Sequence, residues 1–132
     1  MNARDLMIGD YIMFNKNTYI IEEISKKGWV HLIDNDGSEC HVELSSDYIL
    51  DAITPIPLTA EILEKNGFWC ERNVGYVMEE YEYEIIYDSW DHKLRILKNR
   101  KQILNLEFFD EMCVHELQHA LRLCGIDKEI KL

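Results

Sequence analysis

The sequence lacks the long apolar segments and paired cysteines that mark membrane and disulfide-rich proteins. No hydrophobic stretch approaches the length of a membrane span, and residues 1–5 do not lead into the apolar region of a signal peptide. The four cysteines include no CxxC pair. Cys113 and Cys124 fall on one expected helix, about 16 Å apart at 1.5 Å per residue, too far for a disulfide. We therefore expect a cytoplasmic protein with reduced thiols.

Positive charge is also scarce, with 14 basic residues against 25 acidic ones and a formal net charge of −11. Such a chain repels phosphate backbones and anionic lipid surfaces, so neither nucleic acid nor a membrane is expected as a partner. Hydrophobic residues are plentiful, however, at 47% of the chain. They suffice for a packed core in one domain, or in two small modules.

The first 54 residues have the pattern of short strands separated by turns. Strands are expected over residues 10–14, 18–24, 29–33, 40–44 and 48–53, with a turn at residues 15–17 and another at 34–37. Short strands at this spacing are typical of a small SH3-like β-barrel. Pro55 and Pro57 then mark the start of a second module, residues 55–132, which we expect to pack with the first as one unit.

The second module has the pattern of a helix, an antiparallel β-meander and a final helix. Thr59 is a favourable N-cap, and Gly67 a favourable C-cap, for a helix over residues 59–66. Strands are expected within about 68–106, including an alternating segment, 80–85, and a hairpin that places Glu84 opposite Arg95. A helix over about 108–124 completes an α+β fold.

The motif with the most specific chemistry is HELQH at residues 115–119, which matches the HExxH signature of zinc peptidases. On a helix, His115 and His119 can bind one zinc ion, and Glu116 can act as general base on a metal-bound water. The apolar stripe of this helix lies nearly opposite the two histidines, which predicts that both face solvent. The position six residues after His119, where one class of zinc peptidases has its third ligand, is Gly125.

Other metal-binding and charged groups are less specific. His31, His41 or His92 can complete a zinc site only if the fold brings them to the helix. Cys40 and His41 are neighbours on one expected strand, so they point to opposite faces and are poor joint ligands. A solvated face, or an acidic surface that mimics nucleic acid, is formed by Glu79, Glu80, Glu82, Glu84, Asp88 and Asp91.

Aromatic residues of the second module allow two interpretations. They belong either to the core or, if exposed, to a contact surface, because aromatic side chains dominate binding hot spots. The residues concerned are Tyr76, Tyr81, Tyr83, Tyr87 and Trp90.

Three short segments resemble a group of small uncharacterised proteins of Bacteroidetes genomes, prophages and mobile elements. The segments are LMIGDYI at residues 6–12, PIPLT at 55–59 followed by NGF at 66–68, and VHELQH at 114–119. In similar proteins the last segment is closer to VHQLQN, with Gln in place of Glu116 and Asn in place of His119. The resemblance implies that no metal is needed there, and it implies no activity.

We therefore predict a non-enzymatic binding module, phage- or mobile-element-encoded, that contacts another protein. This interpretation assigns no catalytic, cofactor-binding or metal-binding residue. The first alternative is a small zinc-dependent hydrolase with His115 and His119 as ligands and Glu116 as base. The second alternative is an acidic mimic of nucleic acid.

Overall fold

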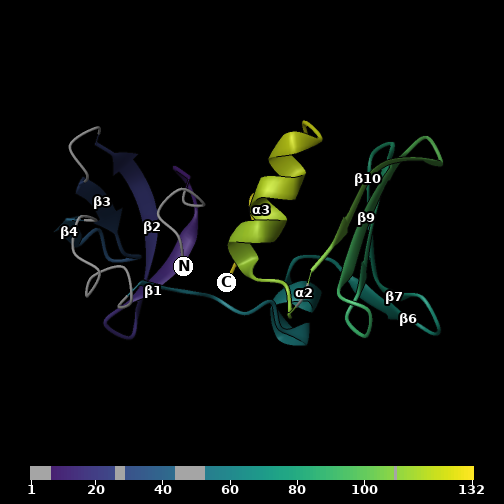
Figure 1. The fold of residues 1–132 in the computed structure, drawn as a ribbon, viewed down its shortest axis with the longest axis horizontal. Coiled ribbons are helices and arrows are strands. Elements are labelled where there is room, and N and C mark those ends of the chain that lie inside the picture. Colours follow the sequence, from purple (N-terminus) through teal and green to yellow (C-terminus); the bar gives the residue numbers. More distant parts are fainter. Residues whose placement is uncertain (1–6, 26–28, 44–52, 109) are drawn as a thin grey trace. The chain divides into compact units, whose positions relative to one another are not determined.

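The structure, a computed structural model, describes residues 7–25, 29–43, 53–108 and 110–132 (Figure 1). The chain divides into two compact units, Met1–Ile56 and Pro57–Leu132. Among the described residues each unit contains one five-stranded antiparallel sheet and the second adds two helices, so the fold class is α+β as predicted. No helix among the described residues is both long and apolar enough to cross a membrane.

The first unit contains a sheet of short antiparallel strands. In sheet order the strands are β4 (Glu39–Glu43), β3 (Trp29–Ile33), β2 (Asn17–Ile24), β1 (Tyr11–Phe14) and β5 (Ile53–Pro55). One face of the sheet carries the hydrophobic core, which consists of Ile12, Ile21, Val30, Leu32, Val42 and Ile53. Because side chains alternate along a strand, residues 29, 31 and 33 of β3 lie on the opposite face.

The first four strands predicted for this unit are present, and each observed end lies within one residue of the predicted end. Most of the predicted strand 48–53 lies outside the described residues, and its last residue, Ile53, begins β5. The SH3-like barrel is not established, because β4 and β5 are the two edges of the sheet and no sheet closes among the described residues. Barrel closure depends on pairing between distant strands, which the local pattern of turns does not specify.

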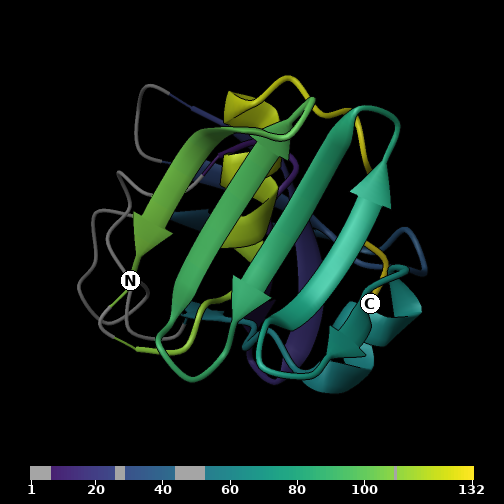
Figure 2. The same cartoon turned by 90° about the vertical axis from the view of Figure 1, so that its right-hand side faces the viewer.

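The second unit is built on a sheet with a helix on one side. In sheet order its strands are β10 (Lys101–Glu107), β9 (Lys93–Lys98), β8 (Tyr83–Asp88), β7 (Gly75–Glu80) and β6 (Trp69–Glu71). Helix α3 (Val114–Leu123) lies behind this sheet in Figure 2. The hydroxyl of Tyr87 accepts a hydrogen bond from the backbone N–H of Met112, at 3.3 Å, and so connects the sheet to the segment before the helix.

The short helix α2 (Ala60–Lys65) has the caps that the sequence predicted. The hydroxyl of Thr59 accepts a hydrogen bond from the backbone N–H of Ile62 at 3.3 Å. The helix ends at Asn66, and Gly67 follows with a φ of +91°, in the left-handed region that favours glycine. The chain turns at Gly67 and enters β6 at Trp69.

The prediction of one alternating strand over residues 80–85 is wrong. It is the hairpin between β7 and β8, with its turn at Tyr81 and Glu82. Tyr81 has a φ of +53°, and 93% of its surface is exposed. The turn contains no glycine, asparagine or proline, and polar and apolar residues alternate through it. The sequence therefore gives no sign of a turn at this point.

The register of the β8–β9 hairpin also differs from the prediction. Glu84 lies opposite Leu97, not opposite Arg95. The loop is four residues long, as expected, but it covers residues 89–92 and not 88–91. Moving a loop by one residue along the chain shifts the register by two, so each side chain keeps its face of the sheet and changes its partner.

The last helix begins at Val114, about six residues later than predicted. Before it, Pro57 and Cys113 form an isolated antiparallel bridge, and the backbone N–H of Leu58 donates to the carbonyl of Met112 at 3.0 Å. This pairing holds residues 112 and 113 in an extended conformation, which is incompatible with a helix at those positions.

Candidate functional site

The HELQH segment lies on α3, and its two histidines are neighbours. The ring centroids of His115 and His119 are 5.5 Å apart, with the planes at 77°. His115 is only 7% exposed, so the prediction that both histidines face solvent is wrong. A helical wheel identifies the face that must be buried, but it does not exclude burial of the opposite face.

Glu116, the residue that would serve as general base, is engaged at the N-terminus of the helix. One of its carboxylate oxygens accepts a hydrogen bond from the backbone N–H of Cys113, at 2.9 Å. This is half of a capping box, and it places a negative charge where the helix dipole favours one. The glutamate of the motif therefore has a structural function that requires no metal.

Cys113, beside this glutamate, is held in its thiol form. Burial, followed by the negative charge of Glu116, raises the pKa of Cys113 to about 11. Metal ligands and nucleophiles are thiolates, so Cys113 is poorly suited to either task near neutral pH.

A third metal ligand beside the two histidines of α3 is not found. Within residues 7–25, 29–43, 53–108 and 110–132, three metal-ligating side chains converge within 4.8 Å only at Glu22, His31 and Glu39, in the first unit. Neither His115 nor His119 belongs to such a group. The alternative of a zinc hydrolase thus has two ligands and a base that is otherwise engaged.

The acidic residues of the second unit do not form the continuous face that a nucleic-acid mimic requires. Glu79 lies opposite Glu84, whereas Glu80, the next residue, lies opposite Tyr83, so the carboxylates are divided between the two faces of the sheet. The Nζ of Lys128 is 3.5 Å from a carboxylate oxygen of Glu80. A basic residue therefore interrupts the acidic surface.

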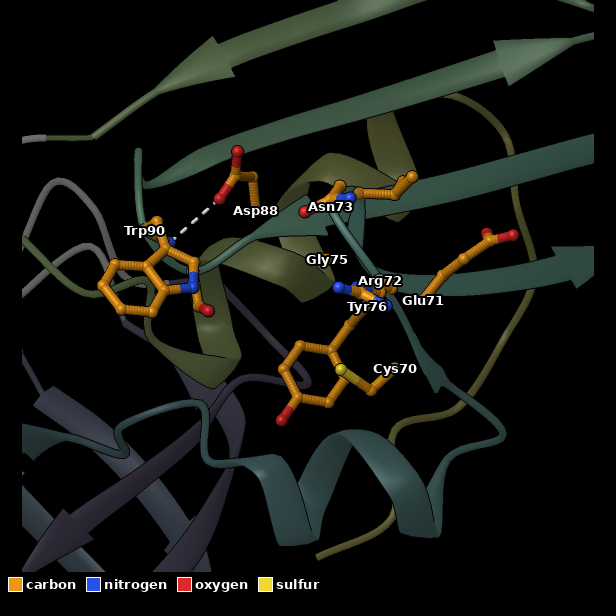
Figure 3. Close-up of a pocket in the computed structure, with 10 residues that line it drawn as sticks. Cys70, Glu71, Arg72, Asn73, Gly75, Tyr76, Asp88 and Trp90 are labelled. Carbon is orange, nitrogen blue, oxygen red and sulfur yellow. Dashed lines mark hydrogen bonds between the residues drawn. The ribbon is translucent and has the colours of Figure 1, made fainter.

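A pocket of about 490 Å³ lies at one end of the second sheet, where the β6–β7 turn adjoins the β8–β9 turn (Figure 3). Strands β7 and β8 are antiparallel neighbours, so the start of β7 and the end of β8 meet at this edge. Trp90 stands at the pocket in the β8–β9 turn, with 90% of its surface exposed. The pocket is lined by residues 70–76 and 88–90.

Two local features hold these turns in place. A carboxylate oxygen of Asp88 accepts a hydrogen bond from the backbone N–H of Trp90 at 2.9 Å (Figure 3). The same oxygen accepts one from the backbone N–H of Asp91 at 3.3 Å, and the two bonds fix the tryptophan-bearing turn. Gly75 permits the close approach of β7 and β8. A Cβ atom there would lie 2.4 Å from the carbonyl oxygen of Tyr87, and the φ of Gly75 is +117°.

The pocket combines aromatic surface with one cationic group. Tyr76 lies opposite Cys70 in the β6–β7 pairing, and both side chains line the pocket with Trp90. Arg72 also lines it, and no hydrogen bond or ion pair of its side chain is found in the part of the chain that the structure describes. This guanidinium is available to an acidic group from outside.

The structure divides the five aromatic residues that the sequence left open between core and surface. Tyr87 is buried and Tyr76 and Tyr83 are half-buried, whereas Tyr81 and Trp90 are exposed. The pocket itself could not be predicted, because it depends on the order of the strands, which places two separate turns side by side.

Comparison with known proteins identifies no relative of the chain. No protein-family model matches it, and neither a curated protein nor a solved structure matches it.

Proposed function

We propose that the protein is a non-enzymatic interaction module that binds a protein partner through the pocket between the β6–β7 and β8–β9 turns. The observation that carries this proposal is the exposure of Trp90 beside a pocket. A tryptophan with 90% of its surface in water forgoes the free energy of burial, which is of the order of 2 kcal/mol for a large apolar side chain. A partner that covers the indole recovers that free energy.

The other side chains of the pocket define the partner's chemistry. The rings of Trp90 and Tyr76 favour an apolar or aromatic side chain, and Arg72 favours a carboxylate next to it. Asp88 uses one carboxylate oxygen to fix the turn, so it contributes less to recognition. The preferred partner is a peptide segment with an aromatic or large aliphatic residue beside an acidic one.

We further propose that the first unit is an SH3-like barrel, that the protein is cytoplasmic and that a mobile element encodes it. We place the first unit among SH3-like barrels, because β5 returns to pair with β1 and so brings the last strand beside the first. A cytoplasmic protein encoded by a mobile element is consistent with the resemblance of its three short segments. Small modules of this kind bind other proteins more often than they catalyse reactions, although fold alone assigns no function.

Selection of peptides from a random library tests the proposal, because it requires only the chemistry of the pocket. The library is displayed on phage and selected against untagged protein, and the dissociation constant of an enriched peptide is measured by fluorescence anisotropy. Trp90→Ala should weaken binding at least about thirtyfold, the effect of a hot-spot residue, and Arg72→Ala should weaken it less. Trp29→Ala, which removes an exposed tryptophan from the first unit, should leave binding unchanged.

The same peptide distinguishes binding from hydrolysis. After incubation with zinc and the parent protein, mass spectrometry should recover the peptide intact. If the parent protein cleaves the peptide and Glu116→Gln does not, the protein is a hydrolase and not a binding module. Equal weakening by Trp90→Ala and Trp29→Ala, or no enrichment of any peptide, would overturn the assignment of the pocket.

A further inference from the structure

A cluster of histidines and carboxylates lies on the sheet of the first unit, on the face opposite its core. His31 of β3 pairs with His41 of β4, and Ile33 pairs with Glu39, so both histidines and Glu39 share this face. The two imidazole rings stack, with their centroids 4.2 Å apart and their planes within 5°. The stacking fixes the plane in which the nitrogens of His31 point.

A carboxylate lies next to each nitrogen of His31. A carboxylate oxygen of Glu22 is 3.1 Å from Nδ1, and one of Glu39 is 3.6 Å from Nε2. Glu22 reaches this position because the register of the β2–β3 pairing shifts between Ile21 and Glu23, which leaves Glu22 as an extra residue in the strand. A bulge of this kind redirects a side chain.

Neutral histidine satisfies only one of these two carboxylates. Its ring has one N–H and one lone pair, and the N–H belongs on Nδ1, where Glu22 is within hydrogen-bonding distance. The lone pair of Nε2 then faces the oxygen of Glu39. The Nε2 atom is buried and has no hydrogen-bond partner among the described residues, and the side chain of His31 is only 15% exposed. A cation between the two atoms would resolve this arrangement.

We propose that this cluster binds a divalent transition-metal ion such as Zn²⁺, with Nε2 of His31 and the carboxylate of Glu39 as ligands. Two ligands at the usual zinc distances of 2.0–2.1 Å are about 3.4 Å apart in a tetrahedral site, close to the observed 3.6 Å. Glu22 accepts a hydrogen bond from Nδ1–H and so orients the ring, as carboxylates behind metal-bound histidines do. Mixed nitrogen and oxygen ligands favour zinc and its neighbours over calcium or magnesium.

This site shares no residue with the pocket in the second unit or with the HELQH helix. One ligand atom from each of Glu22, His31 and Glu39 lies within 4.8 Å of the others, so the ion needs little rearrangement of the side chains. The two carboxylates are largely exposed, so water completes the coordination and exchange with solvent is open.

Titration of the untagged, full-length protein with ZnCl₂ in a calorimeter tests the site. One ion per chain should bind at pH 7.5. Binding should disappear with His31→Asn and weaken at least about tenfold with Glu39→Gln, because each removes a ligand. Glu22→Gln should weaken it about tenfold, the usual effect of losing an orienting carboxylate. Cobalt(II) absorption in the visible range should identify a nitrogen and oxygen ligand set.

Two control variants separate this site from charge effects and from the other candidate. Glu61→Gln removes one negative charge from the second unit, and His119→Asn removes a histidine of HELQH; neither should change the affinity for zinc by more than about twofold. If zinc binding survives His31→Asn, or disappears only with His119→Asn, the assignment is wrong. The assignment is equally wrong if no zinc binds at millimolar concentration.

Discussion

Asn66 connects α2 to the C-terminal segment of the second unit, and its loss should be among the most destabilising polar substitutions. Its side-chain amide donates to the carbonyl oxygens of Ile62 and Lys131 and accepts from the backbone N–H of Lys131, each at 2.7 Å. The residue is 6% exposed. Close by, the ammonium group of Lys65 donates to the carbonyl oxygen of Leu132.

The expected cost of Asn66→Ala follows from these three hydrogen bonds. A buried hydrogen bond contributes about 1 kcal/mol net, and a buried backbone group left without a partner costs about 1–3 kcal/mol. Water can reach part of the vacated space and satisfy some of the groups, which lowers the sum. We therefore expect the free energy of unfolding of the second unit to fall by about 2–4 kcal/mol.

Urea unfolding combined with hydrogen exchange measures this cost and locates it. Amide exchange of Lys131 and of α2 reports the second unit by itself, which matters because the two units need not unfold together. Asn105→Ala, an exposed asparagine on β10, is the matched control and should cost less than about 0.5 kcal/mol. In a chain truncated after Lys128, Asn66→Ala should lose most of its effect. A cost below about 1 kcal/mol, or an equal cost in the truncated chain, would refute the reasoning.

Two further predictions concern the turn end of the sheet and the cysteines. Gly75→Ala should destabilise the second unit by about 3 kcal/mol or more in urea unfolding, because the φ is positive and the added Cβ meets the carbonyl of Tyr87. The control is Gly37→Ala, which also has a positive φ but lies in open space and should cost about 1 kcal/mol. Equal costs would contradict this. With its pKa raised to about 11, Cys113 should react with iodoacetamide far more slowly than exposed Cys70 at pH 8, by mass spectrometry, and accelerate about tenfold per pH unit. The stability that its thiol form contributes is complete below pH 9 and is lost as the pH rises towards 11.

The sequence predicted those elements whose boundaries are set by local chemistry. Thr59 and Gly67 predicted the ends of α2 because a cap acts on backbone groups within a few residues. The turn after Ile33 was predicted by its aspartates and glycine, and Asp34 indeed accepts hydrogen bonds from the backbone of Asp36 and Ser38. The turn at Tyr81 was missed because it contains none of the usual turn residues.

The candidate sites depend on pairing between strands, which is why they are hard to recognise along the chain. Cys40 and His41 are neighbours along one strand, and the prediction that they point to opposite faces is confirmed: Cys40 packs against the core and His41 pairs with His31. The feature of the sequence that indicates the histidine pair is the hairpin itself. Two strands joined by one turn bring histidines to the same face when they are equally distant from it. The bulge at Glu22, in contrast, has no mark in the sequence.

Glu116 provides the sharpest test of what the HELQH motif does. If it caps the helix, Glu116→Ala should cost about 0.5–2 kcal/mol in urea unfolding, and Glu116→Gln, which keeps an oxygen acceptor, should cost less than half as much. Burial is the largest cause of the raised pKa of Cys113, and the charge of Glu116 comes next. Both variants remove that charge, so they should lower the pKa of Cys113 and accelerate alkylation of that thiol at pH 9. Glu61→Gln, in the first turn of α2, is the control for loss of charge near a helix N-terminus. Unchanged stability in Glu116→Ala would show that the carboxylate is not needed as a cap. The carboxylate of Glu116 would then be free to act as the general base that the HExxH match predicts.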